Sequence, residues 1–241
     1  MLEIVAVPVL TDNYVWLIHN PELGETAAVD PSVADPVLEA AAARGWRLTQ
    51  ILNTHWHPDH TGGNQGIQAA TGCTIIAPAE AKRVSEVDLI VSEGDRVTVA
   101  GHEAAVWHIP AHTAGHIAYY FEDEGMIFVG DTLFAMGCGR LFEGTPEQMY
   151  GNLRRIADLP GQVRIYCGHE YTLANARFGA HVEPGNEAVA DRMIEVTALR
   201  EQGQVTLPTT VAQELATNPF VRAADAEEFA RLRRDKDSFR S

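Results

Sequence analysis

The seven residues THWHPDH, Thr54 to His60, contain three histidines and one aspartate and directly follow a largely apolar stretch at 50–53. On a helix, residues two positions apart point in different directions, so His55 and His57 could not bind the same ion there. At the end of an extended strand they lie on the same side and can share one ion. The spacing therefore predicts a metal site at a strand end.

Asp59 and His60 follow at once and must project differently from the first two histidines, because Pro58 disfavours a continuing helix. This geometry suits a second ion beside the first. Imidazole and carboxylate ligands together suit zinc, iron or manganese, and the motif offers no thiolate. We expect two divalent ions, with zinc as the first candidate and iron or manganese as alternatives.

Three further polar residues each follow an apolar run, namely His112 after 106–111, Asp131 after 127–130 and His169 after 165–168. A strand followed by a polar side chain is how α/β folds place functional groups at one edge of a sheet. We predict that the first ion is bound by His55, His57 and His112 and the second by Asp59, His60 and His169, with Asp131 bridging the two.

The other histidines, and Asp30 at a strand end, are not needed as ligands. His116 and Asp30 could each hold a ligand in place, and a purely structural role is equally compatible with their positions. We assign structural roles to His19, His102, His108 and His181.

The net charge is −15, which argues against nucleic acid as a partner, because binding phosphates needs a basic surface. No apolar run reaches about 18 residues, so we expect no membrane span. The start of the chain has no basic segment and carries Glu3, which favours a cytoplasmic protein without a secretory signal. The odd number of cysteines indicates reduced thiols, and we expect Cys73 and Cys167 to be buried.

Short β-branched or aromatic runs alternate with helical patterns up to the strand expected at 163–167. Thr145 and Pro146 are a predicted N-cap and first helical position of a helix that reaches about residue 159. After Tyr171 we expect amphipathic helices at 186–201 and 224–234 with no strand between them. The prediction is an α/β catalytic domain at 1–170 and a helical domain at 171–241.

The last eleven residues carry five of the chain's eighteen Lys and Arg residues against two aspartates, a local charge of +3. Arg233 and Lys236 are three residues apart and would share one helix face. Such a patch could attract an anionic substrate or could be a solvated helix face, and the residues alone favour neither.

The THWHPDH motif resembles the metal-binding signature of the metallo-β-lactamase superfamily. More narrowly, the chain resembles the hydroxyacylglutathione hydrolase, or glyoxalase II, family over nearly its whole length. The resemblance rests on TDNYVWLI (11–18), HTAGH (112–116), GDTLFAMGCGRLFEGT (130–145), CGHEYTLANARF (167–178), HVEPGN (181–186), NPF (218–220) and RRDKDSF (233–239).

This resemblance implies an αββα sandwich followed by a helical domain that helps to bind glutathione. It also implies hydrolysis of S-(2-hydroxyacyl)glutathione, such as S-D-lactoylglutathione, to glutathione and D-lactate in methylglyoxal detoxification. The substrate contacts that carry over are Arg140, Tyr171, Arg233 and Lys236. Arg140 stands where many members have lysine. Phe142 stands where many have tyrosine, so the hydroxyl that could form one glutathione hydrogen bond is absent.

Two ions about 3.5–4 Å apart would share a water molecule and lower its pKa towards neutrality. Asp59 would help to orient the resulting hydroxide, which attacks the thioester carbonyl. The alternatives are a persulfide dioxygenase with one iron or another hydrolase of the same fold. The dioxygenase would not use the second set of ligands. We expect a monomer that acts on a small-molecule thioester.

Overall fold

Two six-stranded sheets organise the computed structural model, which describes residues 1–240. The first sheet has the order β1-β2-β3-β4-β5-β6 and contains β1 (Glu3–Val9), β2 (Asn13–Asn20), β3 (Glu25–Val29), β4 (Arg47–Leu52), β5 (Thr74–Ala77) and β6 (Leu89–Ile90). The second has the order β14-β13-β10-β9-β8-β7 and contains β7 (Arg96–Val99), β8 (His102–His108), β9 (Ile117–Phe121), β10 (Met126–Gly130), β13 (Arg164–Cys167) and β14 (Thr209–Thr210). A small hairpin pairs β11 (Leu133–Phe134) with β12 (Gly137–Cys138).

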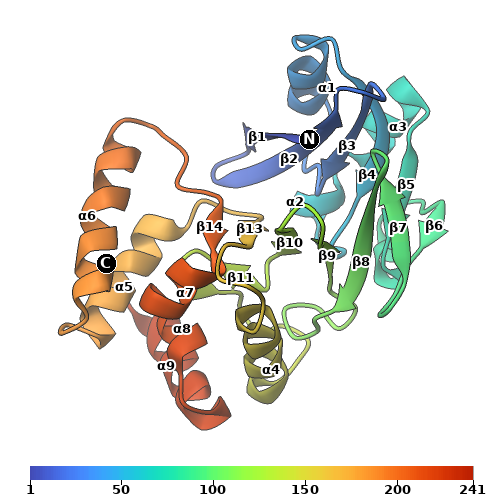
Figure 1. The fold of residues 1–241 in the computed structure, drawn as a ribbon. Helices are drawn as coiled ribbons and strands as arrows, with labels where there is room; N and C mark the ends of the chain where they lie inside the picture. Colours follow the sequence, from blue (N-terminus) through green and yellow to red (C-terminus); the bar gives the residue numbers. More distant parts are fainter. Residues whose placement is uncertain (241) are drawn as a thin grey trace.

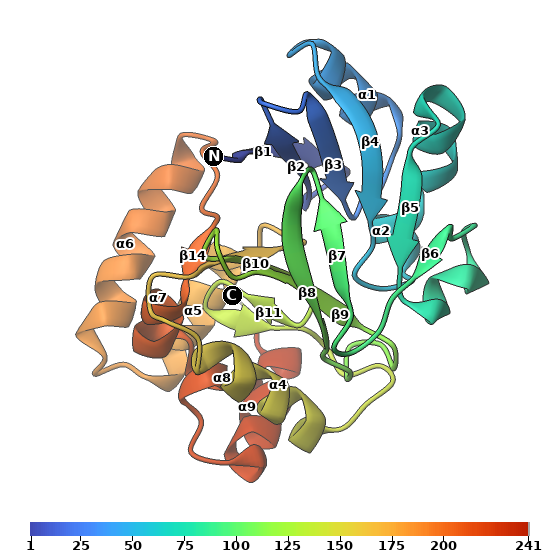
Figure 2. The same ribbon diagram turned by 45° about the vertical axis from the view of Figure 1, so that its right-hand side comes forward.

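Helices cover the outer faces of both sheets (Figure 1). The helices of the described chain are α1 (Asp35–Ala42), α2 (Pro58–Thr61), α3 (Asn64–Thr71), the 3-10 helix η1 (Ala79–Arg83), α4 (Pro146–Ala157), α5 (Thr172–Val182), α6 (Glu187–Glu201), α7 (Val211–Thr217), α8 (Pro219–Arg222) and α9 (Ala226–Ser238). In Figure 2, α1 and α3 lie outside the first sheet, whereas α4 to α9 gather beside the second. The αββα prediction is confirmed.

Strand β2 shows why the first sheet needs cover on both faces, because all eight of its residues are buried. Side chains alternate along a strand. Val15 and Leu17 accordingly join the apolar cluster of α1 and α3, while Trp16 and Ile18 join the main core that extends to the second sheet. A strand buried on both faces reads as a continuous apolar run, as YVWLI at 14–18 does.

Helix α4 begins where the sequence predicts. Thr145 accepts a hydrogen bond from the backbone N–H of Gln148, whose side chain bonds back to Thr145, and Pro146 occupies the first turn. This reciprocal capping satisfies two N–H groups that a helix start otherwise leaves free. The predicted N-cap is confirmed.

The expectation of no strand after Tyr171 is wrong. β14 pairs antiparallel with β13, with Thr209 opposite Ile165 and Thr210 opposite Arg164. A two-residue strand carries no periodic pattern, so its pairing depends on the sheet edge that it meets. Phe178, Phe220 and Phe229 of the C-terminal helices lie in the same apolar cluster as the second sheet. The domain boundary at 170/171 stays a prediction, since the two parts share this core. No helix in the described part of the chain is long and apolar enough to cross a membrane.

Candidate metal centre and substrate pocket

The predicted metal ligands come from the ends of strands in both sheets. Four follow β4 and the other three follow β8, β10 and β13. The motif begins in an irregular segment that follows β4 and bends at Thr54 and His55, and Pro58 then starts the short helix α2 at its first position instead of only ending a strand. Proline suits that position because its missing N–H would have no helical partner. Asp59 and His60 therefore project from a helix, and His55 and His57 from the bent segment between β4 and that helix.

The first group of predicted ligands has three imidazole nitrogens that face one another. Nδ1 of His57 lies 3.1 Å from Nε2 of His55 and 3.0 Å from Nε2 of His112. Burial lowers the pKa of all three imidazoles, that of His55 well below its ordinary value. Neutral imidazoles keep the lone pairs that a metal ion needs.

The second group places Asp59 between two imidazoles. Oδ2 of Asp59 lies 3.5 Å from Nε2 of His60 and 3.5 Å from Nε2 of His169. Asp131 lies between the two groups: its Oδ1 is 3.4 Å from Nε2 of His60, and its Oδ2 is 3.2 Å from Nε2 of His169 and 3.4 Å from Nε2 of His112. Asp131 is thus the residue with an oxygen towards each set.

These distances fit divalent cations. Two ligand atoms on a tetrahedral zinc ion, each about 2.0–2.1 Å from it, are about 3.3 Å apart. Nε2 of His60 and Oδ1 of Asp131 are also buried without a hydrogen-bond partner within residues 1–240. Buried polar atoms are normally paired, so such atoms indicate a missing partner such as an ion. The His and Asp set of this fold therefore fits divalent metal ions.

The pKa shifts of His60 and Asp131 also indicate that the site favours positive charge. Burial alone would lower the pKa of His60, but the Asp131 carboxylate and Asp30 outweigh it and raise that pKa well above its usual range. Burial would raise the pKa of Asp131, yet His60 and His169 hold it well below its usual value. A positive charge at this point is therefore favourable. A bound divalent ion would release the protons that these histidines otherwise hold.

Four of the histidines that face the centre through Nε2 have an oxygen at Nδ1. His112 Nδ1 donates to the carbonyl of Arg140 at 3.0 Å, and His169 Nδ1 donates to Asp12 at 2.8 Å. His60 Nδ1 lies 3.1 Å from Oδ2 of Asp30, and His55 Nδ1 lies 3.0 Å from Oγ1 of Thr54. Such bonds set the tautomer and the orientation of a metal-binding imidazole. Asp12 had no role in the sequence analysis, because its contact spans 157 residues.

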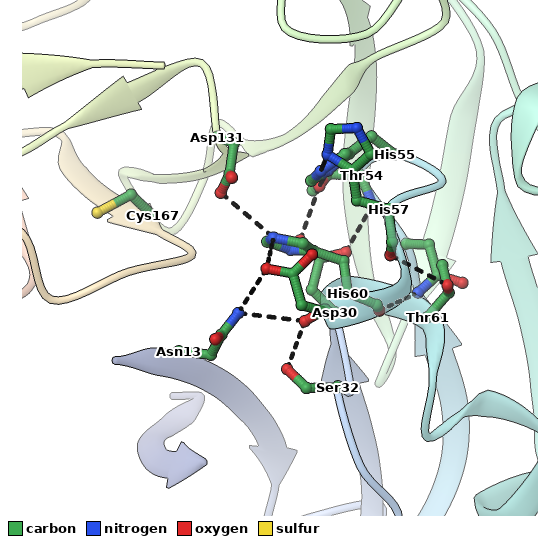
Figure 3. Close-up of polar contacts among 12 residues, drawn as sticks. Asn13, Asp30, Ser32, Thr54, His55, His57, His60, Thr61, Asp131 and Cys167 are labelled. Carbon is green, nitrogen blue, oxygen red and sulfur yellow. Dashed lines mark hydrogen bonds and ion pairs between the residues drawn. The ribbon is translucent and has the colours of Figure 1, made fainter. Parts of the chain in front are cut away.

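The carboxylate of Asp30 contacts both Thr54 and His60 of the THWHPDH motif (Figure 3). Its Oδ1 accepts from the backbone N–H of Thr54 at 2.8 Å, and its Oδ2 accepts from Thr54 Oγ1 at 2.7 Å as well as facing His60. Its backbone has φ of 52°, a conformation that non-glycine residues seldom adopt. Asp30, His55 and His60 also lie close enough to hold an ion. Asp30, however, faces the far nitrogen of His60, so we retain it as a supporting residue.

His116 lies behind the first group. Its ring stacks on His55, with centroids 4.6 Å apart, and its Nε2 accepts from the backbone N–H of Asp131 at 3.2 Å. His116 therefore contacts one ligand of the first group and the bridging Asp131, and it is a supporting residue instead of a ligand. Other histidines have partners away from the predicted ligands: His19 forms a hydrogen bond with Thr26, and His102 pairs with Glu124.

A pocket of about 470 Å³ opens over the metal centre. Its lining includes all four predicted substrate contacts, Arg140, Tyr171, Arg233 and Lys236, together with five of the predicted ligands, His57, Asp59, His112, Asp131 and His169. The ring of Tyr171 is parallel to that of His169, with centroids 4.7 Å apart and an interplanar angle of 4°. A pocket that combines reactive and charged groups is the natural place for a substrate.

The two basic residues of α9 that line this pocket differ in how firmly they are held. Arg233 is 7% exposed; it donates to the carbonyl of Cys138 and to Asp237, both at 2.8 Å. Lys236 donates to the carbonyl of Ala174 at 2.9 Å. Burial and the nearby Arg233 lower the pKa of Lys236 to about 8. Both therefore face the pocket instead of forming only a solvated helix face.

Comparison with known proteins agrees with this geometry. The profile of the metallo-beta-lactamase superfamily matches residues 13–169, and that of the hydroxyacylglutathione hydrolase C-terminus matches residues 170–239. A hydroxyacylglutathione hydrolase from Methylococcus capsulatus is 49% identical over 100% of both chains. One from Erythrobacter litoralis is 48% identical over 99% of this chain and 100% of its own. The chain belongs to the hydroxyacylglutathione hydrolase family.

Solved structures share the fold of this family member. ETHE1 from Myxococcus xanthus has a TM-score of 0.75 at 24% identity, covering 100% of this chain and 92% of its own. The BLEG-1 B3 metallo-beta-lactamase has a TM-score of 0.71 at 18% identity, covering 91% and 99%. At these identities the likeness concerns the architecture.

Several pocket residues of this hydroxyacylglutathione hydrolase family member escaped the sequence analysis. Phe134, Cys138 and Asn175 line the pocket and come from the hairpin β11–β12 and from α5. Their segments, GDTLFAMGC and LANARF, were part of the family resemblance, but nothing in their spacing points to a pocket. All three cysteines are free and buried, which agrees with the expectation of reduced thiols.

Proposed function

We propose that this chain hydrolyses S-(2-hydroxyacyl)glutathione, such as S-D-lactoylglutathione, to glutathione and a 2-hydroxy acid at a centre of two divalent ions, with zinc as the first candidate. The observation that carries the proposal is a single pocket that has the metal-binding cluster on one wall and Arg140, Arg233 and Lys236 on another. The net charge of the chain is −15, so an anionic substrate would be repelled without a local basic patch such as this wall. The family relatives carry the name of the same activity.

The ligand assignment supports two ions. Two groups of ligand atoms lie within 4.8 Å of one another, one from His55, His57 and His112 and one from Asp59, His60 and His169. Asp131 has an oxygen for each. Divalent ions held there would supply an attacking water of lowered pKa and a Lewis acid for the thioester carbonyl.

The residues of the chain supply position and charge. The Asp59 side chain is 40% exposed and Oδ2 accepts from Asn13 at 3.1 Å, so this carboxylate can orient a water molecule in the pocket. We assign the glycine carboxylate of glutathione to Arg233 and Lys236, which line the pocket. The thiolate leaving group has a conjugate acid with pKa about 8.5, so no strong general acid is needed.

The test is release of free thiol from S-D-lactoylglutathione by protein whose bound metals have been quantified. We expect turnover with two equivalents of metal. His169→Ala should lower both the metal content and kcat, whereas the control His102→Ala, which removes a surface contact with Glu124, should change neither. Absence of thiol release from fully metal-loaded protein would contradict the proposal. Full activity of His169→Ala would contradict the two-ion assignment, and oxygen consumption with a persulfide would favour the dioxygenase instead.

A further inference from the structure

A groove lies beside the substrate pocket, between the segment 140–146 and one face of α9. It has a volume of about 390 Å³, and α9 contributes Ala230, Arg233, Arg234 and Asp237. These four positions follow the helical repeat of three and four residues, so they form one continuous stripe. We call this feature the α9 groove.

The α9 groove continues from the substrate pocket. Arg140, Phe142 and Arg233 line both cavities. The ring of Phe142 lies 5.2 Å from that of His112 and 5.7 Å from that of His57. The groove therefore begins one side chain away from the metal centre. An extended tripeptide is about 10 Å long, which is enough to reach from one cavity into the other.

Two charged side chains of the α9 groove, Arg234 and Asp237, have polar atoms without a partner within residues 1–240. The guanidinium of Arg234 forms no ion pair and no hydrogen bond with any residue in 1–240. Asp237 uses Oδ1 to accept from Arg233 at 2.8 Å, with Arg140 Nε at 3.8 Å, but its Oδ2 has no hydrogen bond to the described chain. A free guanidinium close to a carboxylate with a free oxygen suits a zwitterionic amino-acid group better than a simple anion.

Glutathione carries such a group. Its γ-glutamyl residue ends in an α-carboxylate and an α-ammonium, in addition to the glycine carboxylate at the other end. Arg233 and Lys236 are already assigned to the glycine end, and the remaining basic residue of the substrate pocket lining, Arg140, also lines the α9 groove.

We propose that the α9 groove binds the γ-glutamyl head of the substrate, with Arg234 binding its α-carboxylate and Asp237 its α-ammonium. This inference rests on the proposed function and adds a specificity subsite to it. Arg234 is then a substrate-binding residue that selects glutathione thioesters over shorter ones.

The decisive comparison uses two substrates, S-D-lactoylglutathione and S-D-lactoyl-N-acetylcysteinylglycine, a dipeptide thioester that lacks the γ-glutamyl residue and whose acetylated nitrogen cannot take the acyl group from sulfur. Arg234→Gln should raise KM for the glutathione thioester roughly three- to tenfold, the range of one partly exposed charged contact. It should leave kcat for both substrates and KM for the dipeptide thioester unchanged. The matched control is Arg231→Gln, which removes the same charge from an exposed arginine that pairs with Glu228 and Asp235 outside the groove.

Equal KM changes on both substrates, equal changes in Arg231→Gln, or no change in Arg234→Gln would each overturn the subsite. A binding experiment separates this result from the proposed function. Calorimetry with S-hexylglutathione and S-hexylcysteinylglycine should show that Arg234→Gln weakens only the first ligand, whether or not the protein hydrolyses thioesters. Equal weakening of both ligands, or of neither, would contradict the subsite. Absence of hydrolysis with selective binding would contradict the activity alone.

Discussion

Oε2 of Glu214 accepts a hydrogen bond from the backbone N–H of Met136 at 2.8 Å, although 78 residues separate the two. Met136 has φ of 59° and forms the turn of the hairpin β11–β12, which carries Phe134 and Cys138 into the substrate pocket. A non-glycine residue in this conformation is strained and persists only where its surroundings hold it. The other carboxylate oxygen of Glu214 accepts from Arg192 at 2.9 Å, so α6 and α7 support the pocket wall.

We expect Glu214→Gln to lower the free energy of unfolding by about 3–5 kcal/mol, because it leaves the buried Arg192 charge without its partner. Arg192 and Glu214 have side chains only 8% and 2% exposed. Urea unfolding of metal-free protein measures the change. The double variant Arg192→Met, Glu214→Gln should lose less than Glu214→Gln alone, since no uncompensated charge remains. An equal or larger loss in the double variant would disprove this explanation.

Removal of the Asp30 charge should weaken metal binding. Asp30→Asn disturbs the contacts to Thr54 and to His60 Nδ1, and loss of such an orienting group typically costs about 10–100-fold in metal affinity. Competition with a chromophoric chelator gives the affinity. Asp88→Asn, at a carboxylate that bonds to Ile75 and Gln68 away from the centre, serves as the control. Unchanged affinity in Asp30→Asn would show that this contact is only structural.

Lys236 should make substrate capture fall at alkaline pH. Its pKa is lowered to about 8 by burial and by Arg233, so the cation is present below pH 8 and is lost above it. A neutral amine no longer attracts a carboxylate, and kcat/KM for the glutathione thioester should therefore decline as pH rises from 7 to 9. Lys236→Arg should keep its charge over this range and abolish the decline. Identical pH profiles for the two proteins would exclude Lys236 as the titrating group.

A hydroxyl at position 142 should improve substrate binding. Phe142 is 59% exposed as a residue and lines the pocket, so a tyrosine at this position has room for a hydroxyl. One additional hydrogen bond is worth about 1 kcal/mol, so Phe142→Tyr should lower KM about fivefold with little change in kcat. Steady-state kinetics on S-D-lactoylglutathione measure this. Phe142→Leu, which adds no polar group, should not lower KM, and a similar gain in both variants would refute the hydrogen-bond argument.

Much of the site could be predicted because its information is local. Imidazole and carboxylate side chains define the metal chemistry wherever they occur, and the spacing within THWHPDH determines which of them project together. The residues that end β8, β10 and β13 could be grouped with that motif because strand ends converge at one edge of a fold. Local spacing also predicted that Arg233 and Lys236 share one face of a helix, because residues three apart are neighbours on a helix surface.

The supporting contacts could not be predicted in this way. Asp12 reaches His169 across 157 residues, Asp30 reaches His60 across 30, and Glu214 reaches Met136 across 78. No residue type or periodicity specifies these partners, because each depends on how the two sheets and the C-terminal helices pack. β14 is a case of the same kind, since two residues become a strand only against the free edge of β13.

The sequence by itself therefore determined the chemistry of the metal ligands, because side-chain type and local spacing are properties of the chain, and its resemblance to a known family implied the αββα class. Only the tertiary structure decided which nitrogen of each histidine faces the centre, which oxygens support it, and that the α9 groove joins the substrate pocket. Those properties depend on distances between segments remote in sequence, and only the packed core sets such distances.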